Sequence, residues 1–168
     1  LVTALASKNA WERQTAQRLL IQQNDSAAVP LLRESLKSSS ADARFMSAWM
    51  LNRLDKIRPE DLVTLLSDPE PGVRVAAATL AEPFLKNDNT LTQAFLKLSA
   101  DPHSQVRFAA ALSANAALEL TPDTARMLAE IASAGNSDRW TRLATLSRSQ
   151  SLAPIVLQTA TLKATPDM

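Results

Sequence analysis

Apolar residues recur along the chain at the three- and four-residue spacing of an amphipathic helix, in segments separated by short polar turns. Five of these segments share a layout: a polar turn, an arginine, and then small and apolar residues. A small residue follows each arginine by three positions, which lets a neighbouring helix approach closely. The five arginines are spaced 30 to 35 residues apart and are Arg13, Arg44, Arg74, Arg107 and Arg142.

A second apolar stretch follows each arginine segment, around residues 29–36, 62–66, 91–98, 127–131 and 155–157. The pattern predicts five helical hairpins in one domain of residues 1–168, with units at about 5–37, 38–67, 68–100, 101–135 and 136–165. A single hairpin cannot cover its own apolar face, so we expect the hairpins to stack. The predicted architecture is therefore an all-α solenoid of stacked hairpins.

Local signals mark several helix ends. Pro59 and Pro122 stand where a first helical residue is expected, each followed by acidic residues. Asn9 with Glu12 three positions later is close to a capping box. Pro83 is expected to end or kink the helix that precedes it.

The composition supports the all-helical prediction and excludes several chemistries. The 168 residues include 29 Ala and 26 Leu, both strong helix formers, while aromatic residues make up only 4%. With no Cys and one His, the chain offers no disulfide, no thiolate nucleophile, no attachment of c-type haem and no histidine-rich metal site. We expect no cofactor in this chain.

The formal net charge of +1 gives no one-signed field to attract nucleic acid or an anionic membrane. No apolar run approaches the roughly 18 residues needed to cross a bilayer, so no membrane insertion is expected. The sequence starts at Leu1 without an initiator Met, so we expect either a piece of a longer protein or a processed product.

Two segments, residues 68–77 and 101–110, resemble HEAT repeats, because each has an Asp-Pro turn, a Val-Arg pair and an Ala-rich helix. The resemblance implies a right-handed α–α superhelix, a HEAT/armadillo-like solenoid, in which Asp68 and Asp101 are structural repeat positions. Ser7, Ser38 and Asn136 stand in the place of this Asp in the other three units, which weakens any continuous ladder of acids.

A narrower resemblance covers most of the chain through residues 9–20, 48–51, 80–83 and 106–113. These segments are similar to the HEAT block of large exported bacterial proteins classed as membrane-bound dehydrogenases or PVC-type haem-binding proteins. The resemblance implies a periplasmic or cell-surface setting, with a β-propeller and a c-type cytochrome domain as neighbours, and with haem c only in that separate domain. No Cys-x-x-Cys-His motif occurs in this chain.

The arginine series has two interpretations. The five arginines could bind phosphate, but we favour a structural role, in which each pairs with an Asp or with a helix-end carbonyl of the adjacent hairpin. Trp11, Trp49 and Trp140 could form a stacking platform for bases or sugars. Packing in the core or between repeats is the favoured interpretation; if exposed, Trp11 and Trp140 would mark the ends of the array or a docking patch.

Other reactive-looking residues have simple structural explanations. His103 follows an Asp-Pro turn and lacks a second His or Cys that would complete a metal site, so we expect it to be a solvated turn residue. Glu60 and Asp61 suit the first turn of a helix, where acids complement the dipole, better than they suit acid–base catalysis. Ser38, Ser39 and Ser40 form a loop with no histidine in the pattern, so no catalytic triad is predicted.

The sequence therefore predicts a non-catalytic, monomeric scaffold that docks a protein or a neighbouring domain. A specialised form docks the β-propeller or cytochrome of an exported redox protein. Two enzymatic alternatives are a HEAT-like DNA glycosylase, which the neutral charge balance disfavours, and a HEAT-like lyase acting on bilins.

Overall fold

The computed structural model describes residues 1–23, 26–119, 121–134 and 139–147. Across these residues every regular element is a helix, which confirms the predicted all-α class. The chain divides into two compact units, Leu1–Leu80 and Ala81–Met168. Among the described residues, no helix is both long enough and apolar enough to cross a membrane.

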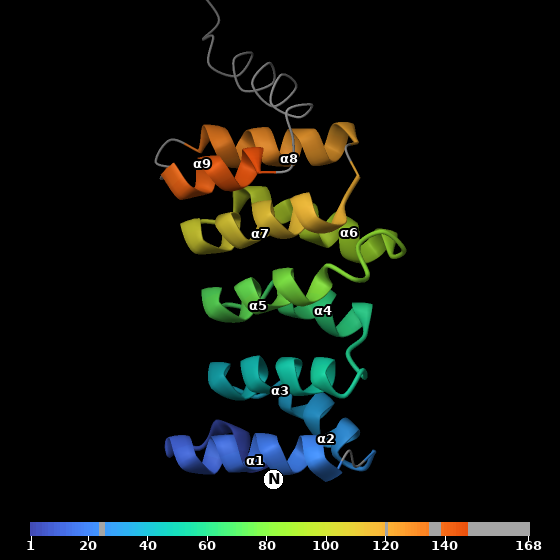
Figure 1. Ribbon diagram of the computed structural model, residues 1–168, viewed down its shortest axis with the longest axis vertical. Helices are drawn as coiled ribbons and strands as arrows, with labels where there is room; N and C mark the ends of the chain where they lie inside the picture. The colour runs from blue at the N-terminus through green and yellow to red at the C-terminus, as the bar shows by residue number, and fades with distance from the viewer. Residues whose placement is uncertain (24–25, 120, 135–138, 148–168) are drawn as a thin grey trace, which may run out of the picture. The chain divides into compact units, whose positions relative to one another are not determined.

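In the first unit, α3 is the central helix, with α1, α2 and the short 3-10 helix η1 packed against it. Figure 1 shows α1, α3 and α5 in successive layers of this unit. Its elements are η1 (Val2–Ala6), α1 (Ala10–Gln23), α2 (Ala28–Ser35), α3 (Ala41–Arg53), α4 (Pro59–Leu65) and α5 (Pro71–Ala81), the last residue of α5 falling in the second unit.

The sequence pattern did not predict η1, because residues 2–6 carry neither an arginine nor a polar turn. Its one buried residue, Leu5, is fully enclosed. This short helix contacts α1, α2 and α3, so it covers apolar surface at the start of the chain.

In the second unit, α7 packs on α9, and α8 packs on α7, α9 and the short helix η2. The elements of this unit are α6 (Asn89–Leu96), η2 (Lys97–Ala100), α7 (Ser104–Ala117), α8 (Pro122–Ser133) and α9 (Arg139–Leu146). The predicted apolar stretch at residues 155–157 lies outside the described residues.

In all five repeats the arginine stands at the same position of its helix. The helices α1, α3, α5, α7 and α9 each begin three residues before their arginine. The small residue three positions after the arginine is always buried, with at most 2% of its surface exposed. A larger side chain there would push neighbouring helices apart. These small residues are Ala16, Ser47, Ala77, Ala110 and Thr145.

Proline marks helix ends as the sequence predicts. Pro59 and Pro122 are the first residues of α4 and α8, where the missing N–H costs no helical hydrogen bond. Helix α5 ends at Ala81, two residues before Pro83.

The predicted capping box at the start of α1 is wrong in part. Asn9 does cap the helix, because its Oδ1 accepts the Trp11 N–H at 3.0 Å. Glu12, however, accepts a hydrogen bond from the Ser7 hydroxyl instead of reaching back to the Asn9 N–H. The Asn9 N–H donates to Ser7 Oγ at 3.1 Å, so the serine of the preceding turn takes the place that the box reserves for Glu12.

Helix α3 ends in a left-handed turn at Asp55, whose φ of 55° is in the region that favours glycine. The Lys56 N–H donates to Leu51 O at 2.8 Å, and the Asp55 N–H donates to Asn52 O at 3.0 Å. This pair of bonds is the Schellman pattern, built here without a glycine.

Candidate functional site

The recurring arginines hold the turns that precede their own helices. In four of the five repeats, Nη1 of the arginine donates to the backbone carbonyl six residues earlier. The bonds are Arg13 to Ser7 at 2.7 Å, Arg44 to Ser38 at 2.8 Å, Arg74 to Asp68 at 2.7 Å and Arg107 to Asp101 at 2.7 Å.

The residue at that carbonyl also stabilises the turn through its side chain. In the same four repeats, its side-chain oxygen accepts the backbone N–H two residues later. Serine and aspartate do this equally, as such turns allow. The bonds are Ser7 with Asn9 at 3.1 Å, Ser38 with Ser40 at 3.2 Å, Asp68 with Glu70 at 2.8 Å and Asp101 with His103 at 2.9 Å.

Asp68 does more than the serines at this position, because it also accepts the arginine of the preceding repeat. Arg44 donates from Nε to Asp68 Oδ2 at 2.6 Å and from Nη2 to Asp68 Oδ1 at 2.7 Å. The two side chains are only 11% and 5% exposed. A planar, two-point pair of this kind fixes the angle as well as the distance between its partners.

The pair shifts the pKa of both groups in the directions expected for a salt bridge. The hydrogen bond with Asp68 raises the pKa of Arg44 above its ordinary value, against the effect of burial. Burial by itself would raise the pKa of Asp68, but hydrogen bonds from Arg44 and from the Glu70 N–H, and the charges of Arg44 and Arg74, lower it.

The other predicted repeat positions differ in their surroundings. Arg13 pairs with no carboxylate of the described residues, since the following repeat has Ser38 at the acid position. Arg107 keeps its Nε buried without a hydrogen-bond partner. Arg142 is exposed on α9, and Asn136, six residues before it, lies outside the described residues.

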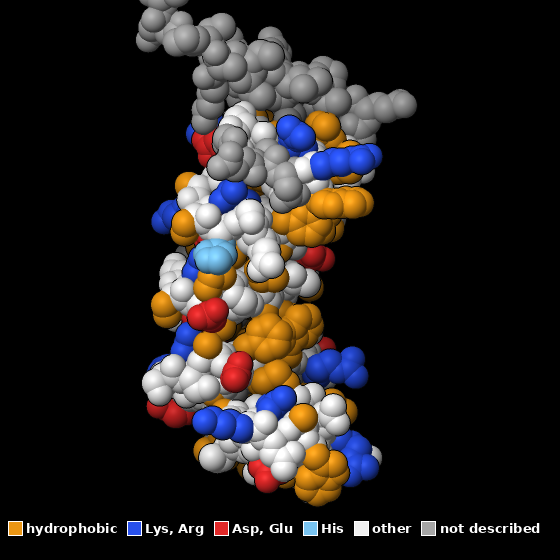
Figure 2. Space-filling view, turned by 90° about the vertical axis from the view of Figure 1, so that its left-hand side faces the viewer, with side chains coloured by type: hydrophobic (Ala, Val, Ile, Leu, Met, Phe, Trp, Pro, Cys, Tyr) orange, Lys and Arg blue, Asp and Glu red, His pale blue; other side chains and the backbone are white. Residues whose placement is uncertain are grey.

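The favoured interpretation of the tryptophans as packed residues is wrong for two of the three. Trp11 is 70% exposed and Trp140 is 69% exposed. Only Trp49 is half-buried, with its ring 6.3 Å from that of Phe45. Figure 2 looks onto the face that carries His103 and shows several patches of hydrophobic side chains at the surface.

The exposure of Trp11 and Trp140 follows from their common place in the repeat. Both stand two residues before the arginine, in the first turn of α1 and of α9. The other repeats have Asp42, Gly72 and Gln105 at this position, and all three are exposed. The polar residues and the glycine of the other repeats were the signal that this position faces solvent.

One cleft of the first unit lies where α3 and α5 begin. It encloses about 380 Å³, and Phe45, the residue after Arg44, forms part of its lining. The carboxylates of Asp42 and Glu70 stand at its edge. Gly72 lies at the position that Trp11 and Trp140 occupy in their repeats, and a Cβ added there would meet no atom within 4 Å.

A cleft of the second unit uses the same repeat positions with different side chains. It encloses about 290 Å³ and is lined by Ser104, Gln105 and Phe108 of α7 and by Trp140 of α9. Phe108 corresponds to Phe45, and Trp140 corresponds to Gly72. The indole therefore supplies an aromatic wall where the cleft of the first unit has no side chain.

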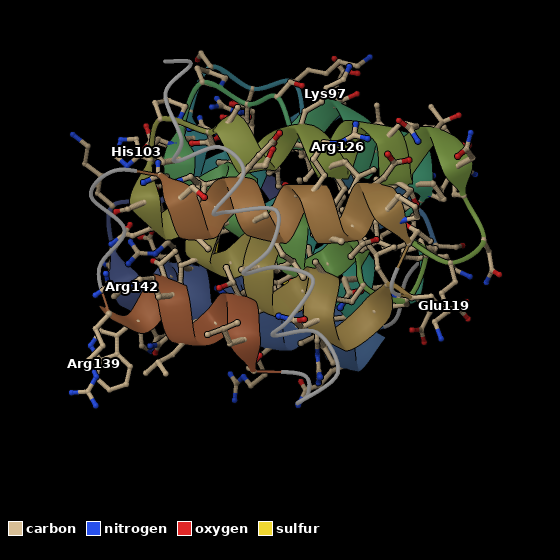
Figure 3. All side chains as sticks on the ribbon, turned by 90° about the horizontal axis from the view of Figure 1, so that it is seen from above. Lys97, His103, Glu119, Arg126, Arg139 and Arg142 are labelled. Atoms are coloured by element: carbon tan, nitrogen blue, oxygen red, sulfur yellow. The ribbon has the colours of Figure 1, made fainter. Side chains whose placement is uncertain are left out.

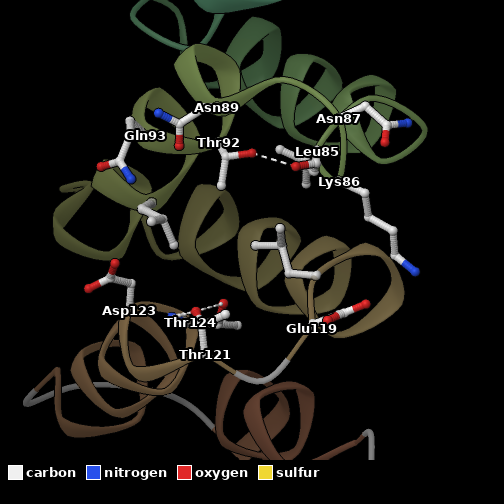
Figure 4. A pocket seen from close by; sticks show the side chains of 12 residues that line it. Leu85, Lys86, Asn87, Asn89, Thr92, Gln93, Glu119, Thr121, Asp123 and Thr124 are labelled. Carbon is white, nitrogen blue, oxygen red and sulfur yellow. Dashed lines mark hydrogen bonds between the residues drawn. The ribbon is translucent and has the colours of Figure 1, made fainter.

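A larger cleft of about 480 Å³, lined by both polar and apolar side chains, lies in the second unit, between the loop before α6 and the start of α8. Figure 4 shows Lys86 and Glu119 at one end of it and Gln93 and Asp123 at the other. Amide and charged groups of both signs line it without a histidine. Such a lining can hydrogen-bond to the polar surface of another molecule. Among the described residues, the hydroxyl of Thr92 donates to backbone carbonyls, and those of Thr121 and Thr124 bond to each other.

The remaining candidate residues lie in structural positions. His103 is exposed just before α7, and its backbone N–H donates to the Asp101 side chain. Asp61 accepts the Arg58 N–H at 3.1 Å and lies 3.4 Å from Arg33, so it serves the start of α4. Across the part of the chain that the structure describes, no three His, Asp or Glu side chains gather closely enough to hold a metal ion.

No protein-family model matches the chain, and no curated protein matches it.

Proposed function

We propose that this chain is a non-catalytic docking scaffold, a right-handed HEAT-like superhelix that binds a protein or a neighbouring domain through its exposed aromatic residues. The observation that carries the proposal is the exposure of Trp11 and Trp140 at one and the same repeat position. Tryptophan is enriched where proteins bind one another, and its side chain is highly buried on average in folded proteins.

The bonds of the arginines support a structural role for them, which leaves the exposed tryptophans as the binding residues of the proposal. In four repeats they are bonded to backbone carbonyls of their own turns, and Arg44 is also bonded to Asp68. These bonds leave the guanidinium groups of those repeats little freedom to bind phosphate. A repeat array offers an extended surface whose binding residues vary while its structural residues recur.

The partners in this proposal come from the resemblance of the sequence to the HEAT block of exported redox proteins. In this proposal the scaffold is a monomeric part of an exported redox protein and docks that protein's β-propeller or c-type cytochrome domain, at the cell surface or in the periplasm. The haem belongs to the cytochrome domain.

The test uses the β-propeller and c-type cytochrome domains that the proposal names as partners. Each domain is expressed separately, and its binding to the full 168-residue chain is measured by isothermal titration calorimetry. We expect micromolar binding that the double substitution Trp11→Ala with Trp140→Ala weakens at least about tenfold, since truncation of a central tryptophan commonly has an effect of this size.

A matched control replaces two exposed aliphatic residues that are not at this repeat position. Ile21 and Leu31 are 40% and 59% exposed. The double substitution Ile21→Ala with Leu31→Ala should leave binding unchanged. Absence of binding by either domain at about 100 µM, or equal weakening by both pairs of substitutions, contradicts the proposal.

A further inference from the structure

The cleft beside Trp140 combines an aromatic lining with an exposed rim. Its walls are Phe108, half-buried on α7, and the indole of Trp140, most of which faces solvent. Among the described residues, Ser104 and Gln105 add polar side chains to its lining. Its volume of about 290 Å³ suits one large side chain of a partner rather than an extended ligand.

Two exposed arginines stand near this cleft without lining it. Arg139 and Arg142 share the first turn of α9 with Trp140. No carboxylate of the described residues is paired with either guanidinium. Figure 3 shows both side chains at the end of the second unit where His103 lies.

The start of α7 has one acid close to it. Helix α7 has no acidic residue in its first turn, but the Asp101 carboxylate just before it accepts the His103 backbone N–H. The first N–H groups of a helix carry a partial positive charge. Asp138 precedes Arg139 in the sequence and lies outside the described residues; with it counted, the segment 138–142 still carries two positive charges against one negative.

We propose that this cleft binds a partner polypeptide through a large apolar side chain flanked by carboxylates. The apolar side chain stacks between Phe108 and Trp140, and the carboxylates face Arg139 and Arg142. This proposal rests on the docking function and names the chemistry of one partner segment.

An acidic polypeptide fits the cleft better than a nucleic acid does. A base would also stack on the indole, but nucleic-acid binding needs a row of cations along the phosphates, and two guanidinium groups neutralise only about two of them. A basic polypeptide is disfavoured because Arg139 and Arg142 would repel it.

The test follows the indole N–H signals of Trp11, Trp49 and Trp140 by NMR in the full chain, assigned with single Trp→Phe variants. The probe is the peptide acetyl-Asp-Phe-Asp-Leu-Asp-amide, and the control peptide has Lys at each Asp. We expect the acidic peptide to shift the Trp140 signal saturably with a Kd of about 1 mM or tighter, and to leave the Trp11 signal in place. The lysine peptide should bind at least about tenfold more weakly.

Charge variants test the role of the arginines. The double substitution Arg139→Ser with Arg142→Ser should weaken acidic-peptide binding about tenfold, while Trp140→Ala should abolish it, as read from the backbone amide signals of Gln105 and Phe108, because that variant lacks the reporting indole. Arg126→Ser is the matched control, because it removes an exposed positive charge from α8 that Figure 3 shows well away from Arg139 and Arg142. It should leave binding unchanged, and circular dichroism checks that each variant is folded.

Three results would overturn the proposal: no shift of the Trp140 signal at about 5 mM acidic peptide, equal shifts with both peptides, or a shift by a short oligothymidylate at lower concentration than by the peptide. Because the domain-binding experiment is separate, its outcome distinguishes the two proposals. Tryptophan-dependent binding of a neighbouring domain without peptide binding contradicts only the partner chemistry. Absence of domain binding contradicts the docking function itself.

Discussion

Arg13 and Arg44 stand at the same position of two successive repeats, yet only Arg44 reaches an acid. Both donate to the carbonyl six residues earlier and so hold the turn before their own helix. Arg44 also forms two hydrogen bonds with Asp68 of the next repeat, whereas the residue that corresponds to Asp68 for Arg13 is Ser38. The comparison separates two functions of the recurring arginine. To hold its own turn, the arginine needs only a backbone carbonyl. To link two repeats, it also needs an aspartate in the next repeat.

The largest effect should come from removing the acid of the linked pair. Asp68→Ala leaves the Arg44 charge buried without its partner and also removes the cap on the Glu70 N–H. We expect a loss of about 3–5 kcal/mol in the free energy of unfolding, measured by urea denaturation. Ser38→Ala is the matched control, because it removes only a turn cap, and should cost about 1 kcal/mol. Equal losses for the two variants would show that the ion pair adds nothing to the turn.

The pH dependence should distinguish the same two repeats. Because the pKa of Asp68 is lowered in the folded chain, its contribution to stability is complete above the ordinary Asp pKa of about 3.9 and is lost as the pH falls towards the folded value. The difference in unfolding free energy between wild type and Asp68→Asn should therefore be constant from neutral pH down to about pH 5 and then shrink. A difference that stays constant down to pH 3 would contradict the assigned charge pair.

The comparison can also be tested by introducing an acid that Arg13 could pair with. Ser38→Asp places an acid in the repeat that follows Arg13, at the position that Asp68 occupies after Arg44. We expect a gain of up to about 1 kcal/mol in unfolding free energy, since Arg13 is only half-buried. The gain should vanish in an Arg13→Gln background. A gain that persists there would have a cause other than the pair.

A substitution at the end of α3, away from the turns of Arg13 and Arg44, should raise the free energy of unfolding without affecting the Arg44–Asp68 pair. Asp55 has a positive φ at the end of α3 and is exposed. Asp55→Gly relieves that backbone strain and should add about 0.5–1 kcal/mol to the free energy of unfolding. Asp55→Ala keeps the Cβ and serves as the control, with no gain expected. A loss on Asp55→Gly would indicate that the Asp55 side chain stabilises the turn.

The smallest effect is expected at the exposed tryptophans. Trp11→Ala and Trp140→Ala should each change the free energy of unfolding by less than about 0.5 kcal/mol, because most of each ring already faces solvent. Thermal unfolding followed by circular dichroism measures this. A loss above about 2 kcal/mol for either variant would mean that the ring is packed, which would remove the basis for a docking role.

Much of the fold was accessible from the sequence because its signals are local. The alanine and leucine content predicted the all-helical class. The arginine period predicted where α1, α3, α5, α7 and α9 begin, and Pro59 and Pro122 predicted where α4 and α8 begin. Helix η1 was missed because it lacks the arginine and the polar turn that mark the other elements.

The candidate site was less accessible, because it depends on which way a first-turn residue points and on what the next repeat places beside it. The tryptophans were expected to pack, since a large apolar residue on a helix usually does. Comparison of the corresponding residues Asp42, Gly72 and Gln105 would have placed Trp11 and Trp140 in solvent. The cleft at Phe108 needs Trp140 from another helix, which no single segment of sequence reveals.

The most direct test of the structural account is a double-mutant cycle on Arg44 and Asp68, with unfolding free energies measured for Arg44→Ala, Asp68→Ala and the double variant. If the pair links the two repeats, the single losses are not additive and the coupling energy is at least about 2 kcal/mol. The parallel cycle with Arg13→Ala and Ser38→Ala should give a coupling below about 0.5 kcal/mol. Additive losses at Arg44 and Asp68 would contradict the claim that this arginine holds one repeat to the next.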